Sequence, residues 1–262
     1  MRRNRSCEHY FSSEYPRGRA VAVEGESIPL PLEKWCAPPL LPVGHHFVTG
    51  LLFLTASTGC IDAVSYLALD KVFTGNMTGN VLFIGFSLVG SGVAPLLNNV
   101  IAFLGFVFGS IIGGRIVGQS APKGLPRSSR GVLIGGAVVI VGLASYWLVV
   151  RDLGHPALLI VTALLAIIMG AQVSAVKPIG NSDVTTIVVT NTLANLARDS
   201  RLAGGIGKNW FPRLAAVIAM GIGAAIGALC VAWRGGAVAL LAGTVIFTAG
   251  MITLVTADRR SV

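Results

Sequence analysis

The chain places one carboxylate, Asp62, deep in an apolar stretch and just before a polar break. Residues 59–65 read Gly-Cys-Ile-Asp-Ala-Val-Ser, and residues 73–80 read Phe-Thr-Gly-Asn-Met-Thr-Gly-Asn. An acid inside lipid is costly, and backbone that leaves a helix there must find other hydrogen-bond partners. Burial disfavours the ionised form, so Asp62 could exchange a proton or hold a cation. The alternative is a structural role, with Asp62 joining helices through hydrogen bonds, for example to Ser65 or Asn76.

The polar break that follows could bind a ligand or simply cap a helix. Its glycines permit unwinding, and its Thr and Asn side chains can satisfy the freed backbone groups. The helix starting near Asn76 would carry a partial positive charge suited to an anionic group. Capping alone, with nothing bound, is the competing interpretation. The candidate substrate or coupling residues of this first element are Asp62, Ser65, Thr74, Asn76, Thr78 and Asn80.

A second polar element begins at Gln172, near the end of another apolar segment. A proline and a glycine break that helix after Lys177, and residues 181–192 are rich in Thr and Asn. Gln172 has roughly the place that Asp62 has in the first element. We expect Lys177 and Asp183 to form no more than an interfacial ion pair, which is worth little energy. The candidates from this second element are Gln172, Ser174, Thr190 and Asn191.

Composition identifies the class of protein. Of the 262 residues, 53% are hydrophobic and 12% are charged, and the mean hydropathy is +0.76. Ordinary soluble domains carry roughly 25% charged residues. The net charge of +9 does not indicate nucleic-acid binding, because the basic residues cluster in a few loops, as the cytoplasmic bias of Lys and Arg produces. We therefore expect a multi-pass protein whose partner is the lipid bilayer, with no nucleic-acid partner.

Two kinds of chemistry find no support in the sequence. The four cysteines share no short spacing, so neither a zinc pattern nor a disulfide framework follows. The four histidines lie in the N-terminal region or in a loop. No nucleophile, metalloprotease or nucleotide-binding motif falls where its fold would need it. The sequence therefore predicts no enzyme activity, no metal site and no cofactor.

Six apolar runs are long enough to cross a bilayer, which needs roughly 20 helical residues. They lie near 47–68, 97–118, 131–150, 156–176, 211–233 and 236–256. Two shorter apolar stretches, 76–92 and 184–198, begin in Thr- and Asn-rich sequence. We expect both to be half-helices or re-entrant segments. A stripe of glycines in the second run (Gly105, Gly109 and Gly113) predicts close packing against a neighbouring helix.

The charges of the loops predict the topology. If both short stretches return to the side they entered from, every basic loop lies on the same, cytoplasmic, face. This gives six crossings in the inner (plasma) membrane with both termini cytoplasmic. Residues 1–46 are polar and proline-rich and are expected to be a disordered cytoplasmic tail. Residues 257–262 form the cytoplasmic C-terminus.

The two halves of the apolar region resemble each other. Gly59 matches Gly170 at an offset of 111 residues, and Gly109 matches Gly223 at an offset of 114. Chance matches in glycine-rich helices are the alternative explanation. An odd number of crossings in each half makes the second half enter from the opposite face, as in many secondary transporters. The predicted fold is an all-α membrane protein with an inverted 3+3 repeat, formed by residues 47–150 and 156–256.

At these motifs the chain resembles the YoaK family of bacterial multi-pass membrane proteins, also designated DUF1275. The resemblance rests on runs 59–65 and 73–80 and extends over about 47–256. The second half departs from it. At 170–174 this chain has Gly-Ala-Gln-Val-Ser where the family tends to have Gly-x-Gln-Asn-Ala, and at 190–191 it has Thr-Asn where the family tends to have Thr-Gly. The resemblance implies about six spans and names no substrate.

These features favour a small secondary transporter in which Asp62 is the coupling or substrate carboxylate. A polar small molecule or an anion would suit the helix termini, and proton coupling would suit the acid. A channel is a close variant. The alternative from another class is a membrane scaffold or sensor that does not transport and uses the N-terminal tail. A homodimer is a further assembly that the chain could form.

Overall fold

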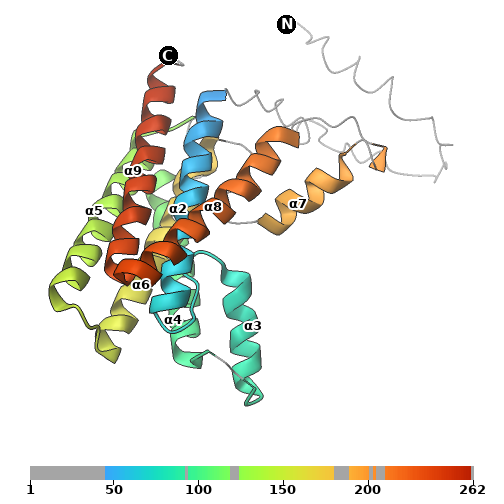
Figure 1. Ribbon diagram of the computed structural model, residues 1–262. Helices are drawn as coiled ribbons and strands as arrows, with labels where there is room; N and C mark the ends of the chain where they lie inside the picture. The colour runs from blue at the N-terminus through green and yellow to red at the C-terminus, as the bar shows by residue number, and fades with distance from the viewer. Residues whose placement is uncertain are drawn as a thin grey trace, which may run out of the picture. The chain divides into compact units, whose positions relative to one another are not determined.

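The structure, a computed structural model, describes residues 45–91, 94–118, 124–179, 189–200, 203–204 and 210–260. Within these ranges every regular element is a helix (Figure 1). Six are long and apolar enough to cross a membrane: α2 (His45–Ala68), α4 (Leu96–Val117), α5 (Arg127–Val150), α6 (His155–Val176), α8 (Trp210–Arg234) and α9 (Gly236–Arg260). The shorter elements are α3 (Met77–Leu88), the 3-10 turn η2 (Lys177–Ile179) and α7 (Val189–Arg198).

All six predicted spans are confirmed, and each boundary agrees to within four residues. Of the two short stretches, the first forms α3, which is apolar as expected. The second differs from the expectation, because α7 is amphipathic and carries Thr190, Asn191, Asn195 and Arg198 within ten residues. The remainder of the second stretch, and the N-terminal tail up to residue 44, lie outside the described residues.

One end of the helix bundle collects the basic residues. Asp258, near the end of α9, pairs with Arg130 of α5 and accepts the N–H of Leu125 at 3.1 Å. The N–H of Gly124 donates to the carbonyl of Pro178, just after α6, at 3.2 Å. The start of α2 lies at this end too (Figure 1). We call it the basic end, because it holds Arg115, Arg127, Arg130, Lys177 and Arg259.

The opposite end is defined by the start of α9. Gly236 lies directly against the rings of Trp147, near the end of α5, and against Ala68, at the end of α2. Two turns in which one acid and one base cancel, at residues 70–71 and 151–152, are at this end. Most of the described basic residues therefore lie at the basic end, although Arg234, in the last turn of α8, lies at the opposite end.

Close packing between helices follows the glycines, as predicted. The closest approaches to the backbone of a partner helix are at Gly59 and Gly223, between α2 and α8, and at Gly109 and Gly170, between α4 and α6. A Cβ on these residues would overlap the carbonyl oxygen of, respectively, Met220, Ala56, Ile167 and Phe106. Small residues let helix backbones approach where lipid provides no hydrophobic drive for association. In both pairs the contacts advance in the same direction along the two chains, so each pair is parallel.

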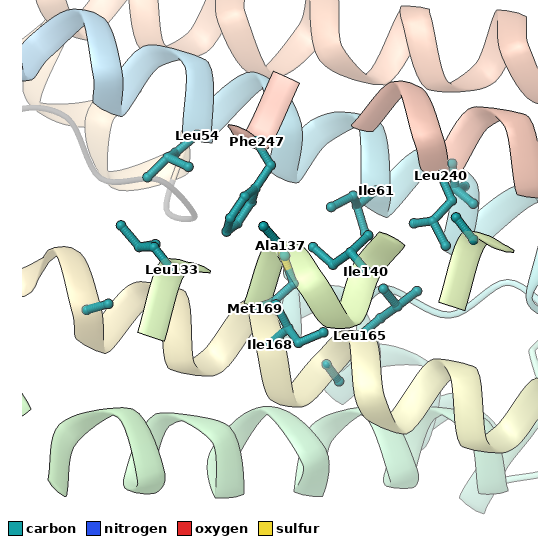
Figure 2. Close-up of a cluster of buried hydrophobic side chains, with 14 of the residues drawn as sticks. Leu54, Ile61, Leu133, Ala137, Ile140, Leu165, Ile168, Met169, Leu240 and Phe247 are labelled. Atoms are coloured by element: carbon teal, nitrogen blue, oxygen red, sulfur yellow. The ribbon is translucent and has the colours of Figure 1, made fainter. Parts of the chain in front are cut away.

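The apolar core lies where α2, α5, α6 and α9 meet. Phe247 of α9 is fully buried, and Figure 2 shows its ring pointing into the space between α2 and the helices α5 and α6. Around it lie Leu54, Ile61, Ala137, Ile140, Leu165 and Met169. Such close-packed contacts are individually small and collectively large. The core therefore holds α2, the helix that carries Asp62, against three other spans.

Candidate functional site

The site begins where α2 ends and the chain reverses. Leu69 and Lys71 donate their N–H groups to the carbonyls of Ser65 and Tyr66, at 3.0 and 3.1 Å. Lys71 and the preceding Asp70 have φ values of 58° and 60°. Two consecutive left-handed residues are unfavourable for side chains larger than glycine, so the surrounding contacts must hold this turn. The turn sends residues 72–76, the break, back along α2 toward Asp62.

The carboxylate of Asp62 is the anchor for the break. Its Oδ1 accepts the N–H of Gly75 at 2.7 Å and the N–H of Thr74 at 3.0 Å, and the Thr74 hydroxyl lies 3.4 Å away. Asp62 itself is 5% exposed. Its second oxygen, Oδ2, is buried and has no hydrogen-bond partner among the described residues. The two amides that Asp62 binds thus belong to the break, three and two residues before α3 begins at Met77.

A second set of bonds fixes the break from the side of α3. Asn80 accepts the N–H of Phe73 at 2.9 Å and donates its Nδ2–H to the carbonyl of Phe73 at 2.6 Å. The rings of Tyr66, Phe73 and Phe83 pack against one another as a triangle: the centroid of Phe73 lies 5.0 Å from Tyr66 and 6.1 Å from Phe83, and Tyr66 lies 6.3 Å from Phe83. Gly79 must lack a side chain, because a Cβ there would lie 2.7 Å from the Phe73 ring. The break is therefore clamped to both α2 and α3.

Gln172 of α6 reaches the same polar cluster through Thr58. Its Nε2 lies 3.5 Å from the hydroxyl of Thr58, which is one turn before Asp62 on α2 and donates to the carbonyl of Leu54 at 3.0 Å. The Oε1 of Gln172 is buried without a hydrogen-bond partner in the described structure. A Cβ on Gly75 would lie 2.8 Å from the Thr58 methyl group and 3.2 Å from Asp62 Oδ2. The chain therefore gathers three polar side chains on one small buried volume.

Thr58 is the residue that the sequence analysis missed. Its spacing of four residues from Asp62 places both side chains on one face of α2. That spacing was visible in the sequence, but threonine is common in apolar helices, where its hydroxyl bonds to the carbonyl four residues earlier. Thr58 makes that bond as well. Its contact with Gln172 depends on how α2 packs near α6, which no local pattern reveals.

The other candidates lie in different places. The Ser65 hydroxyl donates to the backbone carbonyl of Asp62 at 3.0 Å and not to its carboxylate. Asn76 precedes α3 as predicted, but its side chain makes no capping hydrogen bond. Ser174 donates to the carbonyl of Ser110 at 2.9 Å, between α6 and α4. Three candidates are exposed: Thr78 on α3, and Thr190 and Asn191 on α7.

The second polar element is described only in part. Lys177 is exposed at the start of η2. Asp183, the expected partner of Lys177, lies outside the described residues together with the rest of 180–188. The described cluster of Thr58, Asp62 and Gln172 thus takes one candidate from each polar element, Asp62 and Gln172, and Thr74 joins it through its bond to Asp62.

Comparisons with known proteins place the chain in a family. The family model described as a protein of unknown function, DUF1275, matches residues 50–253. A curated relative, the UPF0700 transmembrane protein YoaK of Bacillus subtilis (strain 168), is 34% identical over 151 residues. That match covers 57% of this chain and 64% of the relative, which is less than two thirds of its length. No solved structure matches the chain. The chain belongs to the DUF1275 family of membrane proteins.

Proposed function

We propose that this protein is a small secondary transporter in which Asp62 carries the coupling proton or cation. A polar small molecule or an anion is the substrate class, and the buried cluster of Thr58, Asp62 and Gln172 is the coupling site. The observation that carries the proposal is that the two oxygens of the Asp62 carboxylate differ in their hydrogen bonding. One oxygen is fully used by the break, while the other is buried without a hydrogen-bond partner among the described residues.

Two buried acceptor oxygens without hydrogen-bond partners support a binding site for a proton or a cation. Buried polar atoms in native proteins nearly always have a partner, so exceptions call for an explanation. Asp62 Oδ2 and Gln172 Oε1 are both such exceptions, and both are hydrogen-bond acceptors. A proton on Oδ2, or a cation held between acceptor oxygens, would satisfy this chemistry.

Charge at Asp62 would then be coupled to the conformation of the break. An ionised carboxylate accepts N–H bonds roughly twice as strong as those to a neutral group. Protonation would weaken the hold on Thr74 and Gly75 and favour a conformation in which the break leaves α2. The two left-handed residues at 70 and 71 support a conformational change here, because strain is commonly stored at such points. This couples proton binding to movement of the backbone that lines the site.

The test is proton movement in proteoliposomes. The purified full chain is reconstituted with a pH-sensitive dye inside, and gradients of amino acids, sugars, carboxylates and phosphate are imposed in turn. We expect the wild-type protein to move protons with at least one of these solutes. The Asp62→Asn variant should lose that proton signal, because its amide keeps the oxygen that Thr74 and Gly75 require but cannot titrate.

A matched control removes a carboxylate elsewhere. Asp152 is exposed at the opposite end, so Asp152→Asn should leave the proton signal unchanged. If the wild type moves no proton with any solute of the panel, or if Asp62→Asn keeps both flux and its pH dependence, the coupling role is wrong.

We also propose that the basic end faces the cytoplasm of a plasma membrane and that the two halves form an inverted repeat. The bias of Lys and Arg toward the cytoplasmic side supports the orientation. The repeat is supported by the glycine contacts, since Gly59 and Gly223 recur as Gly170 and Gly109 at offsets of 111 and 114 residues. The first helix of one half, α2, also runs in the opposite direction to the first helix of the other half, α6.

Side-specific labelling tests this topology. In a chain whose native cysteines are replaced, single cysteines at Arg127 and Lys177 should react with an impermeant maleimide only from the cytoplasmic side. A cysteine at Asp152 should react only from the other side. Labelling of Arg127 and Asp152 positions from the same side would contradict six crossings with this orientation.

A further inference from the structure

A cleft at the basic end is not part of the Asp62 cluster. It lies between the last turns of α4 and α6, and its volume is about 890 Å³. Its polar lining comes from Ser110 and Arg115 of α4, Ser174 of α6, and Lys177 of η2. The described lining contains two cations and no carboxylate. Since α4 ends at Val117 and α6 at Val176, the cleft opens where the spans end, at the depth of lipid headgroups.

The two cations of the cleft have no partners within the described structure. Arg115 and Lys177 are exposed, and they form no hydrogen bond or ion pair there. Of the other cations at the basic end, Arg130 pairs with Asp258 and Arg213 pairs with Asp199, whereas Arg127 and Arg259 form no ion pair with described residues. The Arg213 guanidinium, and then that of Arg198, hold the pKa of Asp199 below its usual range. The cleft is thus a place where the described residues leave positive charge uncompensated.

The matching place between α2 and α8 carries no such charge. With the offsets of the glycine contacts, Lys177 corresponds to Tyr66 and Arg115 corresponds to Leu229. The ring of Tyr66 stacks on the ring of Phe73, with centroids 5.0 Å apart, so aromatic side chains fill the space beside this part of α2. The general bias of Lys and Arg toward one face of a membrane would explain the charges of Arg115 and Lys177, but it would not explain a cavity beside them. The α4–α6 cleft therefore combines charge with space, and its α2–α8 counterpart has neither cation.

We propose that this cleft binds a phosphate group, with Arg115 and Lys177 as the cationic ligands. A guanidinium matches phosphate oxygens with parallel donors, and an ammonium adds a point charge. Basic pockets between membrane helices at the headgroup level suit anionic lipids, and the same chemistry would accept a soluble phosphate. The Ser174 hydroxyl already donates to Ser110, so its remaining role toward a ligand is to accept. This site is independent of the Asp62 cluster and of any transport activity.

Binding by the full chain can be measured without knowing the natural ligand. In one arm, native mass spectrometry follows the addition of phosphatidylglycerol or phosphatidylcholine to protein in detergent. In the other arm, the melting temperature is measured in inorganic phosphate and in chloride at equal ionic strength. We expect preferential binding of phosphatidylglycerol, stabilisation by phosphate, or both. A response to the lipid alone assigns a headgroup, and a response to phosphate alone assigns a soluble ligand.

Variants decide whether the cleft is responsible. The pair Arg115→Gln and Lys177→Gln should weaken the anion response about tenfold. A matched pair at the same end, Arg127→Gln and Arg259→Gln, removes the same charge outside the cleft and should change it less than about twofold, because distant exposed charges are screened. Arg115→Lys keeps the charge but loses the parallel donors, so its response should lie between those of the wild type and of Arg115→Gln. Should the double variant fail to fold, Lys177→Gln alone, on the exposed turn η2, tests the same site.

Two results would overturn the proposal. One is an equal loss of response in the cleft pair and in the matched pair, which would mean general attraction to a positive surface. The other is a wild-type protein that neither prefers phosphatidylglycerol nor is stabilised by inorganic phosphate.

Discussion

Replacing Gly223 by alanine is expected to lower the stability of the folded protein in detergent severely. A Cβ at this position of α8 would overlap the carbonyl oxygen of Ala56 on α2. That oxygen belongs to helix backbone, so it cannot move aside as a flexible side chain would. Overpacking a tight interface costs about 1–3 kcal/mol and sometimes more. The measurement is the melting temperature by intrinsic fluorescence, together with the monodisperse fraction in size-exclusion chromatography.

The control for this variant lies two residues away. A Cβ on Gly221 would meet no atom within 4 Å. Gly221→Ala should therefore leave the melting temperature unchanged or raise it, since alanine is favoured over glycine in a helix by up to about 1 kcal/mol. Gly109→Ala, which would overlap the carbonyl oxygen of Ile167 in the α4–α6 pair, should behave like Gly223→Ala. Equal stability of the Gly221 and Gly223 variants would mean that α2 and α8 do not pack as described.

The spans could be predicted from the sequence because one physical requirement determines them. A helix that crosses hydrocarbon needs about 20 apolar residues, and nothing in the tertiary structure can relax that length greatly. The glycines of α4 were recognisable for a related reason, because their spacing of four residues marks a helix face that allows close approach. Which helix each face touches was not predictable, since α2 packs on α8 and α4 on α6, across the two halves of the chain.

The candidate site was located from the sequence, but its internal arrangement was not. The cost of Asp62 in an apolar segment and the polar break after it pointed to the same place. Whether the donors of the break bind an external anion or Asp62 itself cannot be told from residue types, because both satisfy the same N–H groups. Gln172 and Thr58 meet through tertiary packing. The helices α3 and α7 also differ, although they lie at corresponding positions of the two halves: α3 is apolar and α7 is amphipathic. The repeat therefore did not predict the polarity of α7.

Replacing Asp62 by leucine is expected to destabilise the break far more than replacing it by asparagine. Leucine removes the acceptor for the N–H groups of Thr74 and Gly75. A buried donor left without a partner costs about 1–3 kcal/mol. Asparagine presents an oxygen in the position of Oδ1 and places its amide nitrogen where Oδ2 had no partner. The melting temperature and hydrogen exchange of the Thr74 and Gly75 amides would measure the difference.

This pair of variants separates the two roles that the sequence left open for Asp62. If anchoring is its structural role, Asp62→Leu exposes the two amides to exchange while Asp62→Asn protects them nearly as well as the wild type. A loss of proton movement in the Asp62→Asn protein could then be assigned to the missing charge, because the break would still be held. Equal protection in the leucine variant would mean that Asn80 and the aromatic stack of Phe73 hold the break without Asp62, leaving its carboxylate free for coupling alone.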